Sequence, residues 1–144
     1  MNMGMTRLKS FDKNSRCLVS IPGMAEYRKT RAIVGEYTLA EKDREQHFED
    51  SIGCTKEEFE PHLIEIPYRC LVSRQCDNIL ASGRIISCDG RPRDTLRLIA
   101  LCALTGEAAG LAASMISQTG EKAISLDVGQ LQKKLVENKN LLHF

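Results

Sequence analysis

The feature that most constrains the fold of this chain is an apolar run at residues 98–116, whose one charged side chain is Glu107. Residues of two kinds recur along it at steps of three and four, the spacing of one face of a helix. One set is mostly large and apolar and the other has almost no side chain: Leu101, Leu104, Ala108, Leu111 and Met115, against Ala103, Gly106, Gly110, Ala113 and Ser117. The pattern predicts a long helix with a core-facing stripe and a second stripe open to very close approach.

The glycines within this run leave two alternatives for the helix. An interior glycine costs a helix about 1 kcal/mol relative to alanine, so either close packing against another element compensates, or the helix begins near Gly106. In the second case Thr105 is its cap, and free backbone N–H groups form a site for an anion or a carbonyl oxygen. The run also reaches the minimum length of a membrane-spanning helix. A carboxylate at its centre is costly in lipid, so we expect no membrane association, and a membrane-spanning helix stays a minor alternative.

The remainder of the chain predicts short strands followed by helices. We expect strands at residues 16–21, 31–39 and 63–66, and a buried strand at 79–82 that continues past Gly83 through Ile85 and Ile86. Gly35 marks a bulge or a close approach of backbone within the second of these strands. Between them we expect a short acidic helix that begins at Thr38 or Ala40, and irregular structure over residues 50–61. Residues 1–15 are expected to be disordered.

Capping signals predict where the helices begin and end. Asp94 and Thr95 are placed to cap the long helix, and Gly120 is placed to end it. Asp127 then begins a final amphipathic helix, with Val128, Leu131 and Leu135 as its apolar stripe.

Composition excludes several classes of function. The net charge is +1, aromatic residues make up 5% and there is no Trp, so we expect no nucleic-acid partner. Six cysteines in a chain whose first residues lack an apolar run indicate reduced thiols in the cytoplasm. No cysteine pair has C-x-x-C spacing, and His47, His62 and His143 are scattered, so we expect no metal site. No catalytic dyad emerges, and the catalytic residues stay unknown. The arginines Arg84, Arg91, Arg93 and Arg97 flank the strand and helix; they are candidates for binding phosphate or carboxylate, although a solvated loop is favoured for Arg91 and Arg93.

Several ordered segments together resemble the C-terminal end of FAD-dependent oxidoreductases. They are I-P-Y-R at residues 66–69, D-N-I-L-A-S-G-R at 77–84, Arg97, and L-T-G-E-A-A-G-L-A-A at 104–113. Upstream, R-K-T-R-A-I-V-G-E-Y at 28–37 and F-E-D-S-I at 48–52 are similar to further segments of the same family, as is the closing helix at 127–135. The resemblance covers almost the whole chain from about residue 16 onward.

The resemblance implies an α/β fold with a Rossmann-type FAD domain and an inserted substrate domain. Residues 16–66 would be substrate-domain strands with the short acidic helix, and residues 67–144 the C-terminal part of the FAD-binding domain with two closing helices. An isolated fragment of this kind would look α+β. The residues that the resemblance places at the cofactor are Gly83, Arg84, Arg97, Thr105, Gly106, Ala109 and Gly110, with the start of the helix at 106–110 against the flavin.

Departures from the family pattern limit what this chain does alone. It has no G-x-G-x-x-G, the element that binds the FAD pyrophosphate. Lys29 and Ala32 replace a Glu and an Arg of the family, and the cysteines do not match an iron–sulfur run. We therefore expect a C-terminal fragment of an FAD-dependent oxidoreductase that binds FAD weakly or not at all by itself and is inactive alone. Its partners would be FAD and the missing N-terminal Rossmann portion. The alternatives are a non-enzymatic remnant, or one chain of a split flavoenzyme that docks onto a complementary chain.

Overall fold

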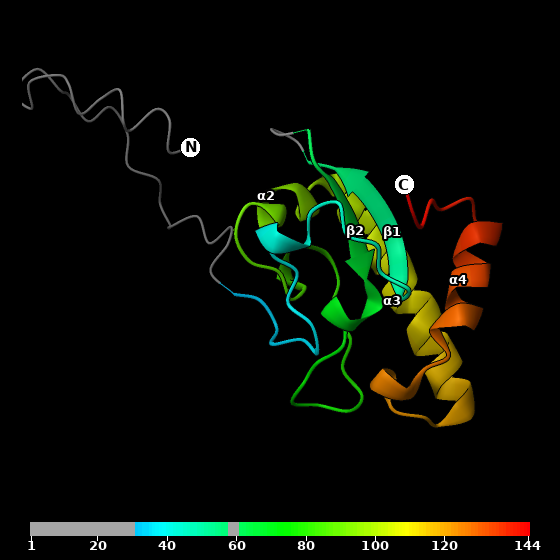
Figure 1. Cartoon of the computed structure of the whole chain (residues 1–144). Coiled ribbons are helices and arrows are strands. Elements are labelled where there is room, and N and C mark those ends of the chain that lie inside the picture. Colours follow the sequence, from blue (N-terminus) through cyan, green and yellow to red (C-terminus); the bar gives the residue numbers. More distant parts are fainter. Residues whose placement is uncertain (1–30, 58–60) are drawn as a thin grey trace, which may run out of the picture.

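The computed structural model describes residues 31–57 and 61–144 of the chain. Within them a two-stranded antiparallel sheet packs with three α-helices, joined by short 3-10 turns (Figure 1). This is a small mixed fold of helices and an antiparallel sheet, and its placement as the C-terminal piece of a Rossmann-type FAD-binding fold stays a prediction. The strand predicted at residues 16–21 and the disorder predicted for 1–15 lie outside the described residues, and the boundary predicted between 16–66 and 67–144 stays a prediction.

The sheet consists of β1 (Ser51–Lys56) and β2 (Leu63–Pro67). Cys54 pairs with Glu65 and Ser51 with Pro67, and a bulge lies between Ser51 and Cys54. The edge of β1 away from β2 is covered by the end of the chain: the Cys54 amide donates to the Leu141 carbonyl oxygen at 3.1 Å. The Ser51 hydroxyl donates to the Leu142 carbonyl oxygen at 2.6 Å. The outer edge of β1 is therefore covered by backbone from a distant part of the chain.

The long helix α3 (Ile99–Thr119) packs against β1, and α4 (Val128–Glu137) packs against both α3 and β1 (Figure 1). Gly120 ends α3 in the left-handed conformation (φ 72°), as predicted. Asp127 caps α4 by accepting from the Gln130 amide at 3.2 Å, also as predicted, and this interaction with Gln130 lowers the pKa of the Asp127 carboxyl. Leu131 and Leu135 of α4 are fully buried.

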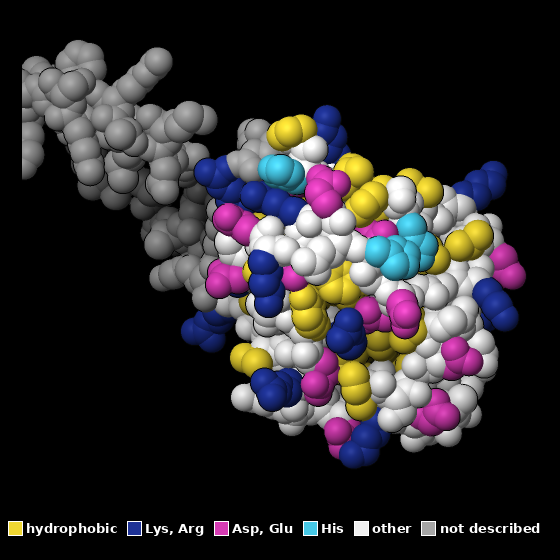
Figure 2. Space-filling view, viewed as in Figure 1, with side chains coloured by type: hydrophobic (Ala, Val, Ile, Leu, Met, Phe, Trp, Pro, Cys, Tyr) yellow, Lys and Arg dark blue, Asp and Glu magenta, His cyan; other side chains and the backbone are white. Residues whose placement is uncertain are grey.

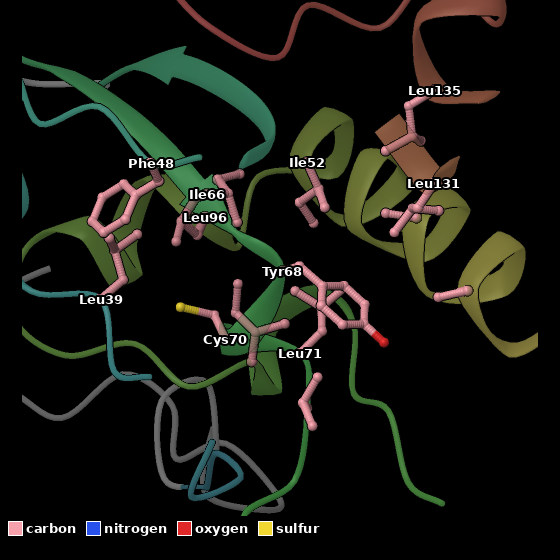
Figure 3. Close-up of a cluster of buried hydrophobic side chains, with 14 of the residues drawn as sticks. Leu39, Phe48, Ile52, Ile66, Tyr68, Cys70, Leu71, Leu96, Leu131 and Leu135 are labelled. Carbon is pink, nitrogen blue, oxygen red and sulfur yellow. The ribbon is translucent and has the colours of Figure 1, made fainter. Parts of the chain in front are cut away.

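The core brings together apolar side chains from every part of the described chain (Figure 3). Tyr68, the largest of them, follows β2 in the 3-10 turn η3 (Tyr68–Cys70), and its hydroxyl donates to the Ala123 carbonyl oxygen at 2.9 Å. Ala123 begins another 3-10 turn, η5 (Ala123–Ser125). Leu96 comes from the short helix α2 (Pro92–Leu96), which precedes α3. One hydrophobic core therefore joins the segments before and after residue 67.

Two of the segments predicted as strands, residues 31–39 and 79–82, do not form strands in the structure. Residues 31–39 contribute isolated bridges, Gly35 to Ser73 and Leu39 to Cys88. The close approach predicted at Gly35 is confirmed, because a Cβ there would lie 2.6 Å from the Cβ of Ser87. Residues 79–82 form one bridge, between Leu80 and Val72, and Ile79 is 47% exposed.

The predicted continuation past Gly83 is also wrong. Gly83 has φ +66°, which turns the chain into the 3-10 turn η4 (Gly83–Ile85). A strand cannot continue through this left-handed residue.

Two further predictions between residues 38 and 61 are wrong. The acidic helix shrinks to the 3-10 turn η2 (Glu41–Asp43), because Asp43 turns inward and accepts from the Tyr37 hydroxyl at 2.7 Å. Glu45 then adopts a positive φ of 57°, which ends any helix there. The segment expected to be irregular instead contains β1. Gly53 within it makes room for Leu104, since a Cβ would lie 2.7 Å from Leu104 Cδ1.

The start of the long helix rules out one of the two alternatives left open by the sequence. The other, close packing against the glycines, is not found among the described residues, since a Cβ at Gly106 or Gly110 would meet no atom within 4 Å. α3 begins at Ile99 after Leu98, with no side-chain cap. Asp94 and Thr95 lie instead within α2. The alternative in which the helix begins near Gly106 is wrong, because Gly106 lies seven residues inside α3. Thr105 is buried in the same helix, and its hydroxyl donates to the Leu101 carbonyl oxygen at 2.8 Å.

Within the described residues, α3 is long and apolar enough to cross a membrane by length and composition. Its buried residues are Leu101, Thr105, Ala108 and Ala112, and the helix packs against η4, α4 and β1. Glu107 accepts hydrogen bonds from Asn138 and Asn140. In this fold α3 serves as a core helix on one side, and its other side is open.

Candidate functional site

A groove of about 440 Å³ runs along the open, small-residue side of α3. Its floor is the helix itself at Gly106, Ala109, Gly110 and Ala113. The segment that precedes Gly83 forms one wall with Asn78, Leu80 and Ser82. Ile116 and Ser117 near the end of α3, together with Ala123 of η5, close the groove. The volume lies within the range of small-molecule sites, roughly 300–1,000 Å³.

The two glycines of the floor are not required by the packing of the described chain. A Cβ added at Gly106 or at Gly110 would meet no atom within 4 Å. At Gly35 and Gly53, by contrast, a Cβ would lie 2.6 Å from Ser87 and 2.7 Å from Leu104. Interior glycines each cost a helix about 1 kcal/mol. The bare floor therefore fits a flat group from outside the described residues that comes close to the helix backbone.

Two hydrogen bonds, one buried and one partly buried, hold the walls of the groove. The Gly83 amide donates to the Thr105 hydroxyl oxygen at 2.9 Å, which fixes the wall at residues 78–82 to α3. The Tyr68 hydroxyl bonds the Ala123 carbonyl oxygen and so holds η5 at the end of the groove. Burial raises the pKa of Tyr68 to about 12, so this hydroxyl stays a donor at neutral pH.

The structure brings together five of the seven residues that the resemblance places at the cofactor. Gly106, Ala109 and Gly110 line the groove, while Gly83 and Thr105 support its wall. Arg84 is exposed in η4 and does not line the groove. Arg97 bonds Asp94 at 3.2 Å, which directs it to α2. Sequence reasoning missed Asn78, Leu80 and Ala123, because no local pattern indicates that these residues meet α3.

The chemistry available in the groove is that of binding and orientation. Its lining carries no titratable side chain, and its polar groups are Asn78, Ser82 and Ser117. These offer hydrogen bonds but no acid or base near neutral pH. The groove is suited to a planar, largely apolar ring system with a few polar edges, and it supplies no general acid or base of its own.

The motif residues around Arg69 form a structural network beside a second cavity. Arg69 binds Asp50 through two hydrogen bonds, Nε to Oδ2 at 2.9 Å and Nη2 to Oδ1 at 3.1 Å. Its guanidinium also lies 5.1 Å from the centre of the Tyr37 ring. The hydrogen bond to Asp50 raises the pKa of Arg69. Three of the motifs singled out in the sequence thus meet here, and the network ties residues 37, 50 and 69 together.

Two histidines that are far apart in the sequence meet at a buried carboxylate. His47 Nδ1 lies 3.3 Å and His143 Nδ1 3.1 Å from Glu65 Oε1. The imidazole rings are 4.5 Å apart, and histidine side chains form a patch on the face shown in Figure 2. The spacing of these residues in the sequence gives no sign of this cluster.

Comparison with known proteins assigns the chain to a family. A family model for FAD dependent oxidoreductases matches residues 5–135 of the 144 residues. Searches of curated proteins and of solved structures give no match. The matched region contains the groove, the hydrogen bond between Gly83 and Thr105, and the pair formed by Asp50 and Arg69. The chain belongs to the FAD-dependent oxidoreductase family.

Proposed function

We propose that this chain supplies the wall of an FAD site that contacts the isoalloxazine ring. The other half of the site, a Rossmann unit that binds the pyrophosphate, would come from a segment outside these residues or from a separate chain. The observation that carries the proposal is the floor of the groove, where two glycines lie in a helix interior with open space above them. Membership of the family supports FAD as the group that fills this space.

The residues present fit one end of FAD and not the other. A glycine and alanine floor lets a flat ring lie against the helix backbone, and Asn78, Ser82 and Ser117 can bond polar atoms at the edge of a ring. The sequence has no G-x-G-x-x-G to bind a pyrophosphate. When bound, FAD supplies hydride and electron transfer. The residues of this chain hold and orient the ring and exclude water from one of its faces.

The resemblance places the start of a helix, and so its positive dipole end, at residues 106–110 beside the flavin, but α3 begins earlier in the chain. The positive end of α3 is at Ile99, and Gly106 is about 10 Å further along the axis at 1.5 Å per residue. The backbone N–H groups at Gly106 and Gly110 lie within the helix. Contact at the floor is therefore a matter of shape and dispersion, and we do not assign hydrogen bonds from these two amides to the flavin.

A titration of the purified chain with two flavins tests the proposal. Because the groove meets only the ring, FAD and lumiflavin should bind weakly and with affinities that differ by no more than a factor of a few, followed by flavin fluorescence. Gly110→Leu should abolish binding of both. Ala103→Leu places the same side chain on an exposed part of α3 outside the groove and should leave binding unchanged.

Two results would oppose the proposal in different ways. Submicromolar binding of FAD by this chain alone would contradict the claim that half of the site is missing. Equal binding by the two leucine variants would remove the groove as the flavin contact and favour the alternative of a non-enzymatic remnant. An in-frame G-x-G-x-x-G in the DNA directly upstream would favour a fragment, and the same motif on a separate co-expressed chain would favour a split flavoenzyme.

A further inference from the structure

We propose that His47, Glu65 and His143 form a binding site for a divalent transition-metal ion of the Zn²⁺ type. This site is separate from the groove on α3 and does not depend on flavin binding. Each residue offers one ligand atom, and the three atoms lie within 4.8 Å of one another. Two imidazole nitrogens and one carboxylate oxygen are a donor set that Zn²⁺ commonly takes in proteins.

The two nitrogen–oxygen distances within the cluster are close to those between ligands of one ion. Ligand atoms held about 2.0–2.1 Å from a tetrahedral ion are about 3.3–3.4 Å apart. The two nitrogens lie 3.3 Å and 3.1 Å from the same oxygen, Glu65 Oε1. An ion can therefore enter between the three atoms with small movements of the two imidazoles, which stand at the surface.

The carboxylate is built into the fold, and its partners are few. The Glu65 side chain is 1% exposed, and its other oxygen, Oε2, accepts the Phe48 amide at 2.7 Å. This bond fixes the orientation of the carboxylate and leaves Oε1 toward the histidines, as second-sphere bonds do in metal sites. A buried carboxylate is costly without a compensating positive charge. A divalent ion supplies that charge.

The two histidines keep the site accessible to an ion from solvent. The His47 side chain is 64% exposed and the His143 side chain 38% exposed. The remaining coordination position would face solvent and take a water molecule. Because the ligands come from the loop before β1, from β2 and from the last residues of the chain, the ion would tie the chain end to the sheet.

Zinc titration of the chelator-treated full chain, with a chromophoric competitor, tests this site. We expect one Zn²⁺ per chain. Since loss of an outer-sphere partner alone reduces metal affinity by about 10- to 100-fold, His47→Ala and His143→Ala should each reduce it by at least that much. His62→Ala is the matched control, because His62 lies beside Glu45 at 3.6 Å and outside the cluster, and it should bind as the natural chain does.

Hydrogen exchange measures the structural role of the bound ion, and it requires no substitution of the buried Glu65. The Cys54 amide donates to Leu141, two residues before His143. Its hydrogen exchange should slow when Zn²⁺ is added to the natural chain and should not respond in His143→Ala. No zinc binding by the natural chain would overturn the proposal. The cluster would then be two imidazoles hydrogen-bonded to one carboxylate. Binding that survives both cluster variants, or that His62→Ala also removes, would overturn it as well.

Discussion

Replacing Gly106 or Gly110 with alanine should stabilise this chain, although both glycines lie in the candidate site. The new methyl group at either position meets no atom of residues 31–57 or 61–144 within 4 Å. The change therefore adds no clash and removes the cost of an interior glycine. That cost is about 0.5–1 kcal/mol per site, so the double variant should gain about 1–2 kcal/mol. The melting temperature should rise by about 2–4 °C for each substitution.

Urea unfolding followed by far-ultraviolet circular dichroism measures this gain, since the chain has no Trp to report by fluorescence. Gly35→Ala is the matched control. It makes the same chemical change where a Cβ would lie 2.6 Å from the Ser87 Cβ and 3.0 Å from the Tyr37 carbonyl oxygen. Ser87 is buried and cannot move aside freely, so this variant should lose about 1–3 kcal/mol.

A lower unfolding free energy with alanine at Gly106 or Gly110 would refute this expectation, because that side of α3 would then be covered by the chain itself. If both variants gain stability, the glycines are retained at a cost to the fold. Such a cost is typical of functional positions. The double variant should then be more stable than the natural chain and bind lumiflavin less tightly, since two methyl groups occupy the floor.

Three further predictions concern the supports of the groove and the core. Thr105→Val removes the acceptor of the Gly83 amide and should cost about 1–2 kcal/mol in urea unfolding; Thr105→Ser should stay close to the natural chain, and equal losses would refute the role of the hydroxyl. Tyr68→Phe leaves the Ala123 carbonyl without its donor and should also cost about 1–2 kcal/mol, whereas an unchanged urea midpoint would refute this. Burial raises the pKa of the Cys88 thiol from 9.0 to about 12. The neutral buried thiol therefore contributes its full share of folding stability below pH 9. This contribution is lost as the pH rises toward 12, because the thiol of the unfolded chain ionises first. Under reducing conditions the urea midpoint should fall between pH 8 and about pH 10.5, and equal midpoints would contradict the assignment.

Elements with local signals could be predicted from the sequence, and elements that depend on distant contacts could not. The start of α4 follows from the Asp127 cap and the stripe of Leu131 and Leu135, all within one short segment. The strand β1 was missed because Gly53 and its polar neighbours are typical of a loop. That glycine is present for a partner on α3, Leu104, which no local window reveals.

The candidate site likewise has one part that could be predicted from the sequence and one part that could not. Its floor could be predicted, because Gly106 and Gly110 recur at helical spacing within one helix. Its walls could not, since Asn78 and Ala123 reach the groove only through the fold. The start of α3 could not be fixed from the sequence, because Leu98 offers no capping side chain and both the Asp94–Thr95 pair and Gly106 remained candidate boundaries. The pairing of His47 with His143 spans nearly the whole described chain and has no sequence signal.

The residues that cover the outer edge of β1 are synthesised well after β1 itself. The sequence of the β1–β2 hairpin is complete at residue 67, but Leu141 and Leu142, which cover its outer edge, are translated much later. Until then the strand presents unpaired backbone groups, and such an edge pairs readily with a strand from another molecule. A chain that stalls or is cut before residue 141 would keep this edge open. The yield of soluble protein should therefore depend on translation through residue 142.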